Sequence, residues 1–141
     1  MSADPKMILA PYLSFNGDCE AAFQAYARIF GGTLGEMFRY GGSPMAGDVP
    51  DGWAEKIMHG SVVIAGVTVM GADMAQDKFD PPKGFSMSVH LKDVAEAERI
   101  FGALVEGGQI LMPLEKTFWA ERFGYAVDRF GITWSINCDA A

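Results

Sequence analysis

Apolar residues recur along the chain at two periods, one typical of helices and one typical of strands. The helical period, with steps of three and four residues, is first met at Phe23, Tyr26, Ala27 and Phe30. Asp18 precedes this segment as a candidate N-cap, and Gly31-Gly32 ends it. A second helix is expected after Asp93, with an apolar face formed by Val94, Ala97, Phe101 and Leu104. The pattern therefore predicts two amphipathic helices in separate parts of the chain.

The strand period, with apolar residues at every second position, is clearest at 85–91. Phe85, Met87, Val89 and Leu91 share one face there, and Ser86, Ser88 and His90 share the other. Further strands are expected at 7–15, 33–40, 56–65, 67–73, 109–114, 124–128 and 132–138. The Gly- and Pro-rich segment 41–53 is expected to be a loop, either a lid over a binding site or an exposed excursion.

The predicted elements occur twice in one order, strand–helix–strand–strand–strand. We expect a single domain over residues 1–141, with a first module at about 7–74, a linker at 75–84 and a second module at about 85–140. Fused units of this length must bury one face of each sheet. The fold class is therefore α+β, with a curved mixed sheet around a cleft and the helices on its convex side.

Composition narrows the possible partners and the location of the protein. Half of the 141 residues are apolar, which excludes a disordered chain. The net charge of −7 argues against nucleic acid as a partner. No apolar run approaches the roughly 20 residues that span a bilayer, and no signal peptide is recognisable, so we expect a cytoplasmic protein with no membrane partner. The two cysteines are too few for a disulfide framework.

Three stretches resemble the PhnB-like branch of the vicinal oxygen chelate superfamily, which includes glyoxalase I, bleomycin-resistance proteins and extradiol dioxygenases. They are Phe23–Gly32, the hairpin that carries His59, Met70 and Asp73, and Phe118–Trp134. The last stretch is the most specific, because it joins Phe-Trp, Arg122-Phe-Gly and an Asp128-Arg-Phe-Gly turn. The resemblance implies a homodimer with a cleft for a small molecule, and a divalent metal in those members that are enzymes.

The metal-ligand positions that the resemblance implies carry no suitable ligands. They fall at Pro11, Ser86 and Ser135, with the fourth near Met70. A divalent metal needs several converging nitrogen or oxygen donors. We therefore predict no metal and no other cofactor. His59 is the candidate catalytic residue, as a general base; like His90, it could instead be a partly buried, hydrogen-bonded residue.

The expected cleft is mostly apolar, with a few hydroxyls and one amide, which is the usual composition of a small-molecule site. Phe118 and Trp119 would stack on a ligand, and Arg122 would hold an anionic group; alternatively the two aromatic residues belong to the core. The full set of candidate ligand-binding residues is Leu13, Phe15, Met70, Ser86, Ser88, Phe118, Trp119, Arg122, Ser135 and Asn137.

The resulting hypothesis is a protein of the glyoxalase and bleomycin-resistance type that binds a small apolar or aromatic molecule without a metal. The alternative is a metal-dependent lyase, isomerase or dioxygenase of the same superfamily. PhnB-like sequences are also often described as demethylubiquinone methyltransferases. The 17 glycines of the chain include no Gly-x-Gly turn for a methyl donor, so we interpret that description as a misassignment.

Overall fold

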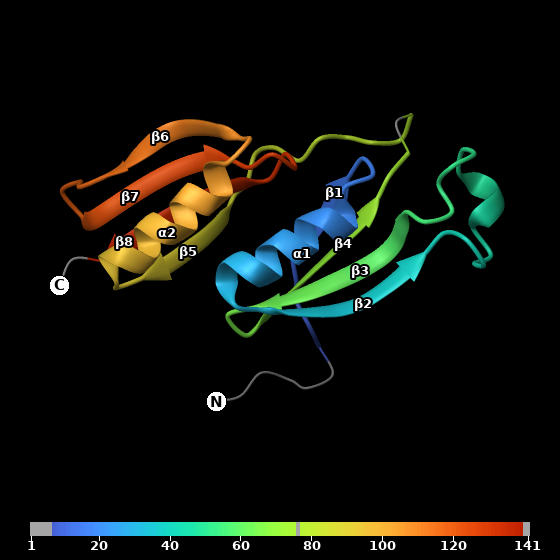
Figure 1. Cartoon of the computed structure of the whole chain (residues 1–141), viewed down its shortest axis with the longest axis horizontal. Coiled ribbons are helices and arrows are strands. Elements are labelled where there is room, and N and C mark those ends of the chain that lie inside the picture. Colours follow the sequence, from blue (N-terminus) through green and yellow to red (C-terminus); the bar gives the residue numbers. More distant parts are fainter. Residues whose placement is uncertain (1–6, 76, 140–141) are drawn as a thin grey trace. The chain divides into compact units, whose positions relative to one another are not determined.

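The computed structural model describes residues 7–75 and 77–139 and divides the chain into two compact units, residues 1–79 and 80–141 (Figure 1). The boundary falls within the predicted linker 75–84. Residue 76 of that linker and residue 140, the expected end of the second module, lie outside the described residues. Within the described ranges, no helix is long and apolar enough to cross a membrane.

Unit 1 places one helix against a four-stranded sheet. Its elements are β1 (Tyr12–Phe15), α1 (Cys19–Phe30), β2 (Thr33–Arg39), the short 3-10 helix η1 (Ala46–Asp48), β3 (Ile57–Ile64) and β4 (Val67–Asp73). The strands lie in the order β1-β4-β3-β2, and only the pairing of β1 with β4 is parallel. Ala65 and Gly66 both have positive φ, at 50° and 78°, and they form the tight turn that joins β3 to β4.

Unit 2 repeats this arrangement. Its elements are β5 (Met87–Leu91), α2 (Val94–Val105), β6 (Gln109–Glu115), β7 (Ala120–Val127) and β8 (Thr133–Asp139). The strand order β5-β8-β7-β6 matches that of unit 1, again with one parallel pairing, between β5 and β8. The predicted α+β class and the paired strand–helix–strand–strand–strand order are therefore confirmed.

Two strand starts differ from the prediction by more than two residues, and the other strand boundaries agree with it to within two. β1 begins at Tyr12 rather than at residue 7, because Pro11 has no N–H for a sheet ladder and the residues before it are largely exposed. β7 begins at Ala120 rather than at Gly124. Gly124 lies inside the strand because α2 crosses it closely: an added Cβ would lie 2.6 Å from Cε1 of Phe101.

The two helices begin in different ways. Asp93 caps α2 as predicted, since its side chain accepts a hydrogen bond from the N–H of Ala95 at 3.2 Å. Asp18 stands at the N-cap position of α1, but its side chain makes no capping hydrogen bond. The oxygen that α1 needs at this end comes from Asp73, at the end of β4, which accepts the N–H of Cys19 at 2.9 Å.

Candidate functional site

Each sheet has one face covered by its own helix and one face opposite it. In unit 1, Leu13, Phe15 and Val69 are buried on the face that packs against α1. In unit 2, Ile136 and Cys138 are buried on the face of α2. Because side chains alternate along a strand, the residues between these positions lie on the opposite face, which we call the open face of each unit.

The open face of unit 2 carries a row of hydroxyl and imidazole groups. Ser88 on β5 lies beside Ser135 on β8, and the Ser135 hydroxyl donates to Oγ of Ser88 at 2.9 Å. Oγ of Ser88 is also 3.0 Å from Nε2 of His90, one step along the same face. The structure thus brings two of the predicted ligand-binding residues into direct contact, together with His90.

An aromatic group lies next to this row, anchored by an amide. Nε1 of Trp119 donates a hydrogen bond to Oδ1 of Asn137 at 3.0 Å, and Nδ2 of Asn137 donates to Oδ1 of Asp139 at 2.7 Å. Phe118 is 97% exposed and Trp119 is 48% exposed, whereas Asn137 is only 8% exposed. The rings of Phe118 and Phe123 meet Trp119 edge to face, at centroid distances of 4.8 and 5.3 Å. The two predicted aromatic residues therefore lie at the surface and not in the core.

The open face of unit 1 holds His59. Oη of Tyr12 is 3.0 Å from Nδ1 of His59, and the ring of Phe38 stacks beside the imidazole at 6.3 Å. Partial burial is the main cause that raises the pKa of Tyr12, with smaller contributions from Cys19 and Tyr40. Met70, another predicted ligand-binding residue, is half-buried on β4 directly beside Tyr12.

Three predicted ligand-binding residues lie elsewhere. Leu13 and Phe15 are each 1% exposed, and the Phe15 ring packs edge to face on Phe23 of α1, so the expectation that they line a ligand site is corrected. Arg122 pairs with Cys138, on the side of the sheet that faces α2, and donates to the carbonyl oxygen of Glu121 at 2.7 Å. It is therefore not on the open face with Trp119.

Ser86 is half-buried and precedes the first residue of β5, so it lies beyond the hydrogen-bonded row. Sequence reasoning did not select Tyr12, Phe38, Phe123 or Asp139 as site residues. Strand alternation could have indicated Tyr12, because this residue shares a face with Ser14 and lies on the opposite face of the strand from Leu13. Phe123 could be found only through the β7–β8 register, in which it pairs with Asn137.

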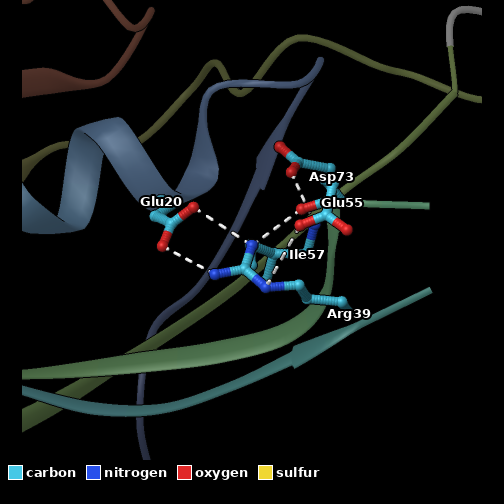
Figure 2. A network of polar contacts seen from close by, with 5 residues as sticks. All are labelled: Glu20, Arg39, Glu55, Ile57 and Asp73. Atoms are coloured by element: carbon cyan, nitrogen blue, oxygen red, sulfur yellow. Dashed lines mark hydrogen bonds and ion pairs between the residues drawn. The ribbon is translucent and has the colours of Figure 1, made fainter. Parts of the chain in front are cut away.

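The buried acid of unit 1 is engaged by the backbone. Oδ1 of Asp73 accepts the N–H groups of Gly17 and Cys19, and Oδ2 accepts that of Ile57 at 2.8 Å. Figure 2 shows the contact between Asp73 and Ile57. Next to it lies a second network, in which Arg39 forms a two-pronged ion pair with Glu20 and a longer contact to Glu55. With its oxygens already occupied, Asp73 holds the fold and is not free to bind a ligand.

The donor set does not fit a divalent metal. The hydrogen-bonded side chains in the row on the unit 2 open face include two hydroxyls, one amide, one imidazole and one carboxylate, supplied by Ser88, Ser135, Asn137, His90 and Asp139. Over residues 7–75 and 77–139, no three or more His, Cys, Asp or Glu side chains cluster in a way that could hold a metal ion. Ser88 and Ser135 also bond to each other, which leaves them poorly placed as shared ligands.

The chain is similar to known proteins over almost its whole length. Residues 7–137 match the family model described as 3-demethylubiquinone-9 3-methyltransferase. Protein YjdN of Escherichia coli is 35% identical over 139 residues, which cover 93% of this chain and 95% of that protein. The crystal structure of protein PA1353 from Pseudomonas aeruginosa has 43% identity and a TM-score of 0.84, and the match covers 94% of this chain and 98% of that one.

More distant structures share the fold. The PhnB protein from Bacillus cereus, titled a putative 3-demethylubiquinone-9 3-methyltransferase, is 22% identical with a TM-score of 0.81, over 94% of this chain and 99% of that chain. A glyoxalase, bleomycin-resistance and dioxygenase domain from Frankia sp. matches 95% of this chain and 98% of that chain at 11% identity, with a TM-score of 0.64. The chain therefore belongs to the family described as 3-demethylubiquinone-9 3-methyltransferase, and it shares its fold with the PhnB protein and with the glyoxalase, bleomycin-resistance and dioxygenase domain.

Proposed function

We propose that the chain binds a small apolar or aromatic molecule on the open face of unit 2, without a metal. The observation that carries this proposal is the hydrogen bond from Trp119 to Asn137, which fixes an exposed indole ring beside buried polar groups. The face of a fixed aromatic ring is a good contact surface for another ring, because few side-chain rotations are lost when the ligand binds.

The polar row beside the ring supports a specific site over a general apolar surface. The hydroxyls of Ser88 and Ser135 and the amide of Asn137 already bond to protein groups, so their remaining lone pairs have fixed directions. A ligand that stacks on Trp119 would find these acceptors within one or two strands of the ring. Apolar surface with a few fixed polar groups is the usual composition of a small-molecule site.

A neutral fluorescent probe tests the site directly. N-phenyl-1-naphthylamine, titrated into the protein, is expected to gain fluorescence and to quench tryptophan emission. Trp119→Ala should weaken binding of the probe by roughly tenfold, because the loss of one aromatic side chain that stacks on a ligand typically removes about that much affinity. Trp53→Ala, at the half-buried tryptophan of segment 41–53, is the matched control and should bind as the parent does. If the parent and Trp119→Ala bind the probe with equal affinity, the proposal is wrong.

Two other activities remain as alternatives. A metal-dependent lyase, isomerase or dioxygenase would bind one divalent ion per chain tightly; elemental analysis after dialysis that finds a stoichiometric metal would favour it. A methyltransferase, as the family description reads, would bind S-adenosylmethionine. Against it stand the absence of Gly-x-Gly from the sequence and two mixed sheets in place of a doubly wound parallel one. Calorimetric binding of S-adenosylmethionine would reverse that judgement.

The same proposal includes a homodimer. Ile110, Leu111 and Met112 lie on β6, an edge strand of unit 2, and all three are more than two-fifths exposed. An exposed apolar edge strand is normally covered by another chain or blocked by charge. Native mass spectrometry should therefore find two chains; a monomer throughout the micromolar range would contradict this part. The expected cytoplasmic location stays a prediction.

A further inference from the structure

Three aromatic rings lie in a row on the open face of unit 1, with a histidine at the centre. The centroid of His59 is 5.7 Å from that of Tyr12 and 6.3 Å from that of Phe38, and the neighbouring ring planes differ by 34° and 27°. Tyr12 is 53% exposed and Phe38 is 49% exposed, while His59 is half-buried between them. The three side chains form one accessible aromatic surface that contains a titratable group.

The strand order explains how the row is assembled. Phe38 on β2 is the direct cross-strand partner of His59 on β3. Tyr12 on β1 is separated from β3 by β4, where its neighbour is Met70. The phenol ring must therefore extend across β4, two strand spacings, to place its hydroxyl on the imidazole. Ala72 is the β4 residue nearest to His59 in register, and its small side chain leaves room for this crossing.

One nitrogen of His59 is engaged, and the other has no partner among the residues that the structure describes. Nδ1 pairs with the Tyr12 hydroxyl, and nothing within residues 7–75 and 77–139 bonds to Nε2. The Tyr12 hydroxyl can donate to Nδ1, which leaves a proton on Nε2, or it can accept from Nδ1, which leaves a lone pair there. Burial raises the pKa of Tyr12, so its phenol stays protonated at neutral pH and both arrangements are accessible.

We infer that this row is a second binding site, for a small neutral hydroxylated aromatic molecule whose hydroxyl bonds to Nε2 of His59 while its ring lies against Tyr12 and Phe38. A hydroxyl both donates and accepts, so it complements either tautomer of His59; a carbonyl or an ether oxygen can complement only one. The chain has a net charge of −7, which repels a negatively charged ligand such as a carboxylate, so a neutral ligand is favoured. The site lies in unit 1 and goes beyond the function proposed for unit 2.

A pair of probes that differ only in the hydroxyl tests the inference. 2-Naphthol and its methyl ether, 2-methoxynaphthalene, present the same ring system, and the naphthol is neutral at neutral pH. The parent protein should bind 2-naphthol about fivefold more tightly, since one net hydrogen bond contributes roughly that factor. In a ¹⁵N spectrum of the imidazoles, 2-naphthol should move the Nε2 signal of His59.

Two variants assign the effect to the right histidine. His59→Phe keeps an aromatic ring in the row and removes both nitrogens. In the Trp119→Ala background, which weakens the site proposed on unit 2, it should therefore abolish the preference for 2-naphthol over its ether. His90→Phe removes the other histidine, on unit 2, and should retain the preference. Trp119→Ala should also leave the His59 signal responsive, which separates this site from the one proposed on unit 2. Equal affinity of the parent for both probes, or a naphthol-induced shift at His90 with none at His59, would overturn the inference even if the His59 variant failed to fold.

Discussion

Oδ1 of Asp73 accepts the backbone N–H of Cys19 at 2.9 Å, so the last residue of β4 holds the first residue of α1. The same carboxyl group accepts the N–H groups of Gly17 at 3.0 Å and of Ile57 at 2.8 Å. The backbone carbonyl oxygen of Asp73 accepts a hydrogen bond from the Tyr40 hydroxyl at 2.7 Å. One buried residue therefore connects the turn after β1, the start of α1, the start of β3 and the residue that follows β2.

Replacing this carboxyl group should destabilise unit 1 severely. Asp73→Ala leaves two buried N–H groups and one partly buried N–H group without acceptors, and each buried loss costs about 1–3 kcal/mol, so we expect a decrease of about 3 kcal/mol or more in the free energy of unfolding. Asp73→Asn should cost less, because Oδ1 can still accept two hydrogen bonds while the new amide opposes the Ile57 N–H. Urea denaturation measures both. Asp80→Ala, at an exposed position, is the control; an effect of similar size there would contradict the role given to Asp73.

The ion pair of Glu20 with Arg39 should make stability depend on pH in the acidic range. The hydrogen bond from Arg39 lowers the pKa of Glu20 below its ordinary value. A carboxyl group whose pKa is lower in the folded state stabilises the fold above its unfolded pKa, and that contribution disappears as the pH falls through the folded pKa. Glu20→Gln should therefore be less stable than the parent at neutral pH and equal to it in acid.

The comparison requires unfolding curves of the parent and of Glu20→Gln at several pH values. Glu98→Gln on α2 removes a charge for which the described residues show no ion pair, and its difference from the parent should not follow the same course. A Glu20→Gln difference that stays constant from neutral to acidic pH would show that the charge on Glu20 contributes nothing to stability.

The helices were the most predictable part of the fold. Both are defined by periodicity and by local end signals, and the observed ranges Cys19–Phe30 and Val94–Val105 follow directly after the acidic residues that predicted them. The start of β7 was not predictable in this way. Ala120–Phe123 show no clean alternation, and their assignment as a strand depends on pairing with β8, which no local pattern reports.

The candidate sites show the same division. Alternation placed Ser88 on the polar face of its strand, the resemblance placed Ser135 in the cleft, and the two hydroxyls do touch. The Trp119–Asn137 contact joins residues 18 positions apart and depends on the β7–β8 register. Asp73 was singled out only as part of the hairpin on which the resemblance rests, and its partners Gly17 and Cys19 are more than 50 residues away in sequence. Leu13 and Phe15 were assigned to the wrong face because an apolar run on a short strand does not say which side the helix covers.

Both cysteines should be unreactive in the folded protein. Burial is the main cause that raises the pKa of the Cys19 thiol, with Asp73 and Glu20 adding to it; burial also raises that of Cys138. The thiolate is the reactive form, so neither group should react with 5,5′-dithiobis(2-nitrobenzoate) at neutral pH until the protein unfolds. In urea, two thiols per chain should be released. Rapid stoichiometric labelling of the native protein would mean that one of these thiols is accessible.

Because α2 approaches β7 closely at Gly124, any side chain at this position would clash with Phe101. A Cβ at this position would lie 2.6 Å from Cε1 of Phe101, and core overpacking of this kind costs about 1–3 kcal/mol. Gly124→Ala should therefore lower the free energy of unfolding by that amount. A double variant with Phe101→Leu, which removes the clashing ring atoms, should lose less stability than the sum of the two single changes. Gly102→Ala on the exposed side of α2 meets nothing within 4 Å and should stabilise the helix by about 0.5–1 kcal/mol. Strictly additive losses in the double variant would show that Gly124 and Phe101 are not coupled, and that another cause places glycine in the middle of this strand.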